Sequence, residues 1–350
     1  MQKLFILVLC LVFQVLAFSQ KKEFQVAVVG FYNLENLFDT LDSPDTDDRE
    51  FLPTGGNNWT PEVYQDKQKN MARVISELGT ETSPDGIAIL GVGEVENRLV
   101  LEDLVKQPAL ADRHYQIVHY DSPDERGIDV GLIYQPKYFR VTGSRAIPLI
   151  LYGEDGERNF TRDILYVAGM LDGEPLHILV NHWPSRRGGE KATRPMRNAA
   201  ALICKNVADS LMALDPAAKV IITGDLNDDP NSPSVQDVLA CKNEKKEVRK
   251  GDLFNPMNEF FVQGYGTLAY QDSWNLFDQI IISHGLTTQR QEGYRFHEAT
   301  VYKKPYLIQQ TGQYKGYPFR TFDFGNYIGG YSDHFPVYLT LVKAKKEARP

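Results

Sequence analysis

Apolar residues recur along this chain in runs of four to eight that end in polar or charged side chains. Short runs rich in β-branched and aromatic residues, bounded by turn residues, are typical of buried strands. The pattern predicts ten strands, at residues 24–31, 86–92, 115–120, 129–134, 147–152, 164–171, 176–180, 220–223, 279–283 and 337–342.

Two segments have the spacing of amphipathic helices. The first begins with Thr60-Pro61-Glu62, a helix-start signal, and stops before Gly79, which predicts a helix over 61–78. The second is expected over 198–214. No repeat or linker divides the chain, so we predict one large α/β domain.

Carboxylate, amide or imidazole side chains stand where six of the predicted strands begin or end. They are Asn33, Glu94, His182, the pair Asp225 and Asn227, Asp278, and the pair Asp333 and His334. Taken singly, most of them are also consistent with a turn or a helix cap. Together, side chains delivered by strand ends can converge on one rim of a sheet assembly.

Two of these positions are hard to explain as packing or as turns. Glu94 ends an apolar run with no cation nearby in the sequence, and an unpaired carboxylate is costly to bury. A metal ion would remove that cost. Asp333 and His334 place a carboxylate beside an imidazole directly before the last strand.

A basic segment follows His182. Arg186, Arg187, Lys191, Arg194 and Arg197 accompany a single glutamate there. In an acidic protein this segment predicts a local anion-binding patch. The alternative interpretation is a solvated helix start.

The net charge is −8, and it becomes −9 if residues 1–19, whose one charged side chain is Lys3, are removed. An acidic chain does not coat nucleic acid non-specifically, but it can still hold an enzyme with a local basic cleft. Residues 1–19 have the apolar run and the small-x-small ending of a secretory signal peptide. We therefore expect an exported protein, periplasmic or secreted, with no transmembrane segment.

Two smaller expectations complete the organisation of the chain. Cys204 and Cys241 remain after signal-peptide cleavage and are able to pair in an oxidising compartment. Residues 343–350 are expected to form a charged tail after the last strand. No protein partner is evident from the sequence.

The side chains at the strand ends predict phosphoester chemistry. Glu94, Asp333 and Asn33 suit a hard cation such as Mg²⁺ or Mn²⁺, with Ca²⁺ as a further candidate. Such an ion neutralises charge on a phosphate oxygen and on the leaving oxygen. His334 and Asp225 are both candidates for the general base, and Asp278 is a candidate to hold a histidine in one tautomer.

This set of motifs resembles the endonuclease/exonuclease/phosphatase superfamily, which includes pancreatic-type deoxyribonuclease, apurinic endonucleases, sphingomyelinases and inositol polyphosphate 5-phosphatases. The resemblance covers residues 24–342 and implies that 20–342 is one catalytic domain. It implies an α/β fold, a four-layer α/β sandwich with two packed mixed β-sheets flanked by helices. It also implies a metal-dependent phosphoesterase site between the loops of the sheets.

The resemblance also implies roles for the strand-end residues. His334 would be the catalytic imidazole with Asp278 as its partner, and His182 would stabilise the transition state. Asp225 and Asn227 would hold the nucleophile and the phosphate oxygens. Glu94 would ligate the metal, assisted by Asn33 and Asp333.

Weaker parts of the match concern substrate binding. Arg162 resembles an arginine that contacts substrate phosphate, and Asp129 is expected to orient His182. Arg186 and Arg187 are further expected phosphate contacts, since they belong to the basic segment.

We interpret the chain as an exported, divalent-metal-dependent phosphodiester hydrolase, with an endonuclease acting on DNA or RNA as the leading hypothesis. One alternative is a phospholipase C-like phosphodiesterase, or a phosphomonoesterase acting on a lipid or sugar phosphate. The aromatic stretch 314–331 would then be a membrane-facing loop. A second alternative is an inactive binding module with the same fold.

Overall fold

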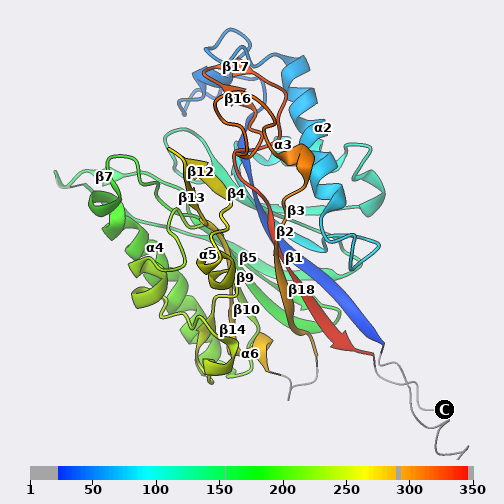
Figure 1. Cartoon of the computed structure of the whole chain (residues 1–350). Coiled ribbons are helices and arrows are strands. Elements are labelled where there is room, and N and C mark those ends of the chain that lie inside the picture. Colours follow the sequence, from blue (N-terminus) through cyan, green and yellow to red (C-terminus); the bar gives the residue numbers. More distant parts are fainter. Residues whose placement is uncertain (1–22, 154, 289–292, 346–350) are drawn as a thin grey trace, which may run out of the picture.

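The computed structural model describes residues 23–153, 155–288 and 293–345 (Figure 1). The predicted signal peptide, 1–19, and residues 346–350 of the predicted tail lie outside the described residues.

Two six-stranded sheets make up the centre of the described structure. The strands of the first sheet are, in spatial order, β15 (Arg295–Val301), β18 (Val337–Ala344), β1 (Phe24–Leu37), β2 (Ile89–Val95), β4 (Asp129–Tyr134) and β3 (Gln116–His119). Those of the second are β11 (Leu253–Phe254), β14 (Asp278–Ser283), β10 (Val220–Asp225), β9 (Glu174–His182), β8 (Ile164–Leu171) and β5 (Phe139–Ile147).

The same pairing pattern is repeated in both sheets. The middle pair is parallel, β1 with β2 and β9 with β10, and the strands on either side of it run antiparallel. The middle strands therefore end at the edge where their antiparallel neighbours β18, β4 and β14 begin. Residues at the ends of the middle strands and at the starts of these antiparallel neighbours therefore lie at one edge of the two sheets, which we call the rim.

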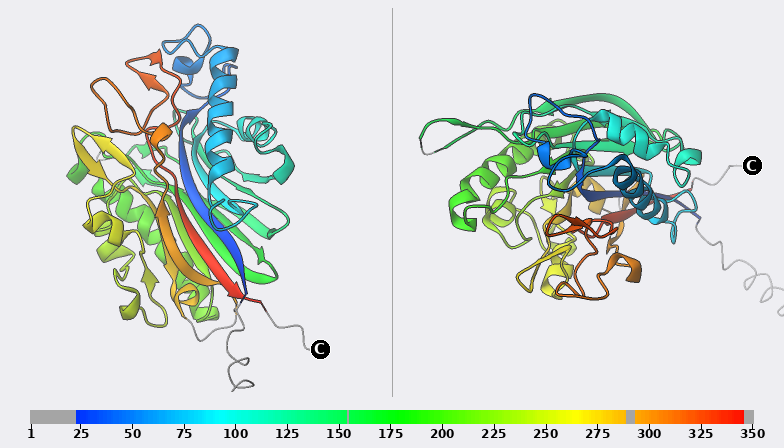
Figure 2. Two further views of the ribbon diagram at one scale, coloured as in Figure 1. Left: turned by 45° about the vertical axis from the view of Figure 1, so that its right-hand side comes forward. Right: turned by 90° about the horizontal axis from the view of Figure 1, so that it is seen from above.

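Helices cover the outer faces of the two sheets (Figure 2). Helix α2 (Pro61–Glu77) and helix α3 (Arg98–Val105) pack on the first sheet, and α4 (Glu190–Leu214) packs on the second. A third apolar core, which includes Phe31 and Val180, lies between the sheets. The predicted four-layer α/β sandwich is confirmed.

Shorter elements connect these layers. Three two-stranded ribbons pair β6 (Leu151–Tyr152) with β7 (Arg158–Asn159), β12 (Leu268–Tyr270) with β13 (Ser273–Asn275), and β16 (Phe322–Asp323) with β17 (Asn326–Tyr327). Short helices are α5 (Asn258–Val262) and α6 (His284–Thr287), and single helical turns lie at Arg49–Phe51, Ala111–Arg113, Ser234–Val238, Lys245–Glu247 and Pro305–Leu307.

Most predicted elements are present, and the differences have physical reasons. Strands β5 and β15 were missed because they lie at sheet edges and are half exposed, so they contain no buried apolar run. The strand predicted at 147–152 is divided between the end of β5 and β6. Helix α4 begins eight residues before the predicted 198, because its first turns are charged and contain Pro195.

The start of the predicted tail needs correction, and the structure answers the question that the sequence left open about the two cysteines. Strand β18 continues to Ala344, and the Lys343 Nζ lies 2.6 Å from Glu174 Oε1, so the strand extends into the segment expected as tail. Cys204 and Cys241 are both buried free thiols. Among the described residues, none of the helices combines the length and the apolar character needed to cross a bilayer.

Candidate active site

Strand alternation carries polar side chains to the rim between the two sheets. On β1, Val29 and Phe31 face the core between the sheets, so Asn33, two residues further on, faces the same way. On β9, Ile178 and Val180 face this core, so His182, two residues further on, faces it as well. The facing surfaces of the two sheets thus end in polar groups that point toward each other.

The second sheet adds two carboxylates by the same rule. Ile280 and Ile282 of β14 face the core between the sheets, which puts Asp278 on that face. Asp225 ends β10 directly opposite Asp278 on one side and His182 on the other. Two carboxylates and an imidazole therefore stand on adjacent strands at one level.

Glu94 reaches this rim through an irregularity in β2. Regular alternation would turn Glu94 toward the helices, because Leu90 and Val92 belong to the core under α2. Instead, the pairing of β2 with β4 shifts between Gly93 and Val95, and Glu94 has a φ of 58°. Bulges of this kind re-aim a side chain, and this one points the carboxylate of Glu94 into the rim.

Gly224 is required where β10 approaches its neighbour. Its φ is 151°, and a Cβ added there would lie 2.0 Å from the carbonyl oxygen of Asn181. We expect Gly224→Ala to lower the free energy of unfolding by about 3 kcal/mol, because backbone must move to relieve the contact. Urea denaturation measures this, with Gly143→Ala as control, since a Cβ at Gly143 meets nothing within 4 Å. Equal stability of the two variants would contradict the expectation.

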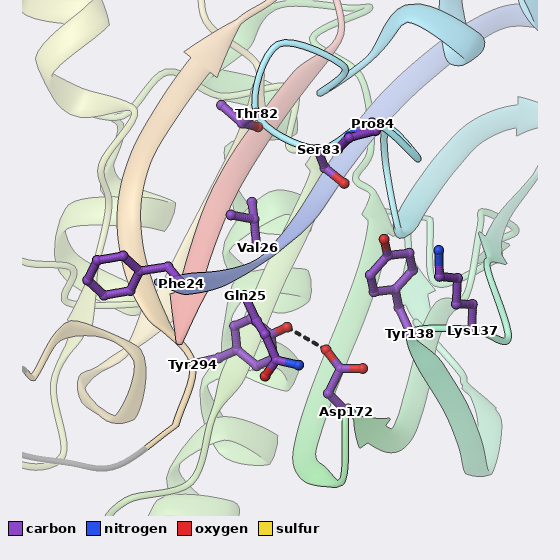
Figure 3. Close-up of a pocket in the computed structure, with 10 residues that line it drawn as sticks. All are labelled: Phe24, Gln25, Val26, Thr82, Ser83, Pro84, Lys137, Tyr138, Asp172 and Tyr294. Carbon is purple, nitrogen blue, oxygen red and sulfur yellow. Dashed lines mark hydrogen bonds between the residues drawn. The ribbon is translucent and has the colours of Figure 1, made fainter. Parts of the chain in front are cut away.

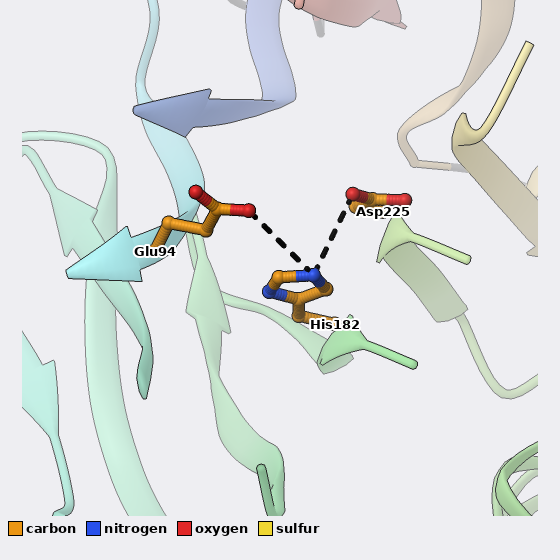
Figure 4. A group of neighbouring side chains, drawn as sticks. All are labelled: Glu94, His182 and Asp225. Atoms are coloured by element: carbon orange, nitrogen blue, oxygen red, sulfur yellow. Dashed lines mark ion pairs between the residues drawn. The ribbon is translucent and has the colours of Figure 1, made fainter. Parts of the chain in front are cut away.

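A buried cluster of two carboxylates and an imidazole forms at the rim (Figure 4). The Nε2 atom of His182 lies 3.8 Å from Glu94 Oε1 and 3.6 Å from Asp225 Oδ2. Asn33 Nδ2 donates to the same two oxygens at 3.2 Å each. The backbone N–H of Asn36 donates to the second Glu94 oxygen at 3.0 Å. One atom from each member of the cluster lies within 4.8 Å of the others.

The electrostatics of this cluster fit a divalent cation. The pKa of Asp225 is raised to about 7, mainly by burial. The negative charges of Asp278 and Glu94 also raise this pKa, whereas the positive charge of His334 lowers it. Burial lowers the pKa of His182 well below its usual value, so this imidazole is in the uncharged form that binds metal ions. Two carboxylates linked by an amide, beside a neutral imidazole, form a set of side chains that could hold a divalent metal ion.

His334 completes the rim from the loop before β18. Its Nδ1 lies 2.6 Å from Asp278 Oδ2, and its Nε2 faces Asp225 Oδ2 at 3.9 Å. Burial would lower the pKa of His334, but the Asp278 carboxylate, aided by Asp225 and Asp333, raises it well above the usual value. The Ser332 hydroxyl donates to the Asn33 carbonyl at 2.7 Å and accepts from the His334 N–H at 3.1 Å, which holds this loop against β1.

The sequence profile of the endonuclease/exonuclease/phosphatase family matches residues 28–343, nearly the whole described chain. The chain belongs to this family. No curated protein matches its sequence.

Solved structures share the fold of this family member at low sequence identity. An endonuclease/exonuclease/phosphatase family protein from Bacteroides thetaiotaomicron is 16% identical, with a TM-score of 0.54 over 92% of this chain and 97% of that one. D. rerio TDP2 complexed with single strand DNA product is 14% identical, with a TM-score of 0.52 over 91% and 99%. The mannosyl-6-phosphatase Bt3783 of B. thetaiotaomicron is 16% identical, with a TM-score of 0.51 over 90% and 99%.

The metal ligands expected from the sequence differ from the cluster that forms. Glu94 is a member, but Asn33 turns its Oδ1 to the N–H of Glu35 at 2.9 Å and presents its nitrogen to the carboxylates. Asp333 lies outside the cluster and pairs with Arg320 at 3.5 Å. His182 and Asp225 are the other members of the candidate cluster. The Asn33 amide links the two carboxylates, and the roles of Asn33 and Asp333 as metal ligands stay predictions.

Two of the three arginines expected to bind phosphate have partners within the protein. Arg162 is 6% exposed, donates to the carbonyls of His182 and Trp183, and pairs with Asp124 at 2.9 Å. Arg186 pairs with Asp228 and donates to the Asn227 carbonyl at 2.9 Å. Both support the backbone that carries His182 and Asn227, and their contact with a substrate phosphate stays a prediction. Arg187 is exposed and remains a prediction.

Asn227 and Asp129 also have partners that the sequence did not reveal. Asn227 has a φ of 49°, and its Nδ2 donates to the Trp183 carbonyl at 3.0 Å, beside the cluster. Asp129 does not orient His182: its Oδ2 lies 3.0 Å from His119 Nε2, and its Oδ1 accepts from the N–H of Ser122. Among the described residues, His182 Nδ1 has no hydrogen-bond partner. Asp129 pairs with His119 rather than with His182 because β4, which begins at Asp129, is the neighbour of β3, which ends at His119.

A buried lysine near the site was missed. Lys67 of α2 is fully buried and donates at 2.5 Å to the Thr321 hydroxyl and to the Tyr331 carbonyl. It therefore ties helix α2 to the segment that leads into Asp333 and His334. The sequence feature that could have revealed its burial is its spacing along the helix, because Lys67 lies on the same helix face as Tyr64, Met71 and Val74.

A cavity of about 360 Å³ lies beside Phe24, at the end of β1 that is farther from the rim (Figure 3). The Tyr294 hydroxyl donates to Asp172 there, and Lys137 pairs with Asp85. Lys137 and Asp172, the charged residues that line this cavity, thus already have partners within the protein. It contains none of the residues of the rim.

Proposed function

We propose that this chain is a divalent-cation-dependent phosphodiester hydrolase that acts on nucleic acid as an endonuclease. The observation that carries the proposal is the His334–Asp278 pair facing the buried cluster of Glu94, Asp225 and His182. Family membership supports phosphoester hydrolysis, and the likeness to a TDP2 complexed with single strand DNA product favours nucleic acid.

The residues of the rim have complementary tasks in this proposal. Asp278 fixes the tautomer of His334, so that Nε2 faces the reacting groups. His334 Nε2 and Asp225 Oδ2 lie 3.9 Å apart, and a water between them transfers its proton to this pair as a unit. Asn227 holds a phosphate oxygen beside the end of β10.

Glu94, Asp225 and His182 would hold the cation. When bound, the ion neutralises charge that develops on the phosphate and on the leaving oxygen. Asn33 keeps the two carboxylates at a fixed separation. We further propose that the protein is exported, because of the signal-peptide pattern in residues 1–19.

A panel assay with and without chelator tests this function. We expect hydrolysis of plasmid DNA, or of RNA, in Mg²⁺ or Mn²⁺ and its loss in EDTA. Activity that persists in EDTA would contradict the role of the cation. No turnover of DNA, RNA, phospholipid or bis(4-nitrophenyl) phosphate in any metal would overturn the proposal in favour of an inactive binding module.

A second candidate is a phosphomonoesterase acting on sugar phosphates. The likeness to a mannosyl-6-phosphatase over 90% of this chain favours it. Release of inorganic phosphate from mannose 6-phosphate, without cleavage of DNA or RNA in the same assay, would select this candidate over the nuclease.

A further inference from the structure

A cavity of about 550 Å³ opens beside the proposed catalytic pair. Its walls come from the β12–β13 ribbon and the segment 313–320, and its inner end includes Asp333. Asp333 Oδ1 lies 4.0 Å from His334 Nε2, so a residue that lines the cavity is a close neighbour of the imidazole that faces the reacting groups. A substrate with its phosphate at the rim would extend into it.

The walls of this cavity are aromatic. Tyr270, Tyr314 and Tyr317 line it, and the rings of Tyr314 and Tyr317 lie 5.6 Å apart at 46°. Tyr317 lies 6.1 Å from Trp274, which stacks on buried Phe335 at 6.1 Å. The rings form a continuous series from the core to the solvent. We call the cavity the tyrosine pocket.

The rings of the tyrosine pocket are held rather than free. The Tyr317 hydroxyl donates to Asp272 Oδ1 at 2.7 Å and accepts from the Asp272 N–H at 2.6 Å, which ties the segment 313–320 to the β12–β13 ribbon. Tyr270 is nevertheless 66% exposed. Exposed aromatic rings around a concave, pre-formed site are typical of surfaces that bind a ring-shaped ligand.

Polar groups in the tyrosine pocket are arranged along its length. Arg320 stands at the inner end, where its Nε lies 3.4 Å from Glu35 and its Nη2 lies 3.5 Å from Asp333. Gln271 and Gln313 lie at the outer part and are exposed. The pocket therefore has an ion-paired arginine on the side of the rim and exposed amide donors and acceptors at Gln271 and Gln313.

We propose that the tyrosine pocket binds the nucleobase of a nucleotide next to the cleaved phosphate. A base has a π-face for Tyr314 and Tyr317, and its edge has donors and acceptors that match side-chain amides. A lipid chain would leave the exposed amides of Gln271 and Gln313 without partners. This inference rests on the proposed nuclease function, because it places the base relative to the phosphate at the rim.

Quenching of Trp274 fluorescence tests the proposal independently of turnover. The chain has three tryptophans, and Trp59 and Trp183 are fully buried, which leaves Trp274 beside Tyr317 as the one that a ligand reaches. We expect adenosine 5′-monophosphate to cause saturable quenching in EDTA, and Trp274→Phe to abolish it. Tyr314→Ala should weaken binding at least about 10-fold, since stacking on one ring contributes roughly that factor or more. Tyr152→Ala, which removes an exposed ring of β6 outside the pocket, should not change it.

The outcomes separate this inference from the proposed function. Quenching that Tyr314→Ala weakens, without turnover of any phosphodiester, supports the pocket and overturns the function. Cleavage of DNA without quenching, or with quenching unchanged in Tyr314→Ala, overturns the inference and leaves the function in place. Quenching by mannose 6-phosphate and not by adenosine 5′-monophosphate overturns it in favour of a sugar ring.

Discussion

His334→Ala is expected to lower phosphodiester turnover by roughly 10³- to 10⁴-fold in Mg²⁺ or Mn²⁺, near the upper end of what one acid-base group contributes. The reason is the geometry of the ring, with Nδ1 bonded to Asp278 at 2.6 Å and Nε2 facing Asp225. No other imidazole of the rim has a carboxylate partner on its far nitrogen, because His182 Nδ1 is without a hydrogen-bond partner among the described residues. Steady-state kinetics on the best substrate of the panel measures the loss.

Two further variants separate chemistry from folding. Asp278→Asn keeps the volume of the side chain and removes its charge, so we expect turnover to fall by about 10²-fold or more while thermal stability changes less than in His334→Ala. His297→Ala removes an exposed histidine of β15 and should retain full activity. Full activity of His334→Ala would remove this residue from the chemistry.

Glu94→Gln is expected to weaken Mn²⁺ binding by at least 10²-fold and to reduce turnover by about 10³-fold. The substitution keeps the shape of the side chain but takes one of two carboxylates from the cluster, into which the bulge of β2 aims Glu94. Isothermal titration with Mn²⁺ measures the binding without reference to any substrate.

Glu298→Gln is the matched control, because it removes an exposed carboxylate of β15 outside the cluster. It should bind Mn²⁺ as the unaltered protein does. If Glu94→Gln and Glu298→Gln bind Mn²⁺ equally well, the ion is held elsewhere, and the assignment of Glu94, Asp225 and His182 fails.

The sequence could predict the layers and the polar ends of the strands because both follow from local pattern. Buried strands such as β8 contain continuous apolar runs, and alternation then determines where His182 and Asp278 point. The helix over 61–78 was predictable from its start signal and spacing. Edge strands β5 and β15 were not, since half-exposed strands have no such run.

Partner choice among the charged residues was not predictable, because it depends on contacts between distant segments. Arg162 stands 38 residues from Asp124 in the sequence, yet the pair is almost fully buried. Asp129 meets His119 only because β3 and β4 are neighbours. The bulge at Glu94 likewise depends on the pairing of β2 with β4. A sequence pattern shows that a residue is polar at a strand end, and tertiary structure decides what it touches.

The first and last strands of the described chain lie side by side. Strand β1 pairs with β18 along eight residues, from Phe24 with Ala344 to Phe31 with Val337, and the loop before β18 carries His334. Strand β1 has its other neighbour, β2, early in synthesis, but its pairing with β18 forms only when the chain is nearly complete, and such long-range pairing is slow. The loop that places the imidazole of His334 beside the carboxylates of β10 and β14 depends on this last pairing. A chain that lacks the last strand would therefore lack the arrangement on which the proposed activity rests.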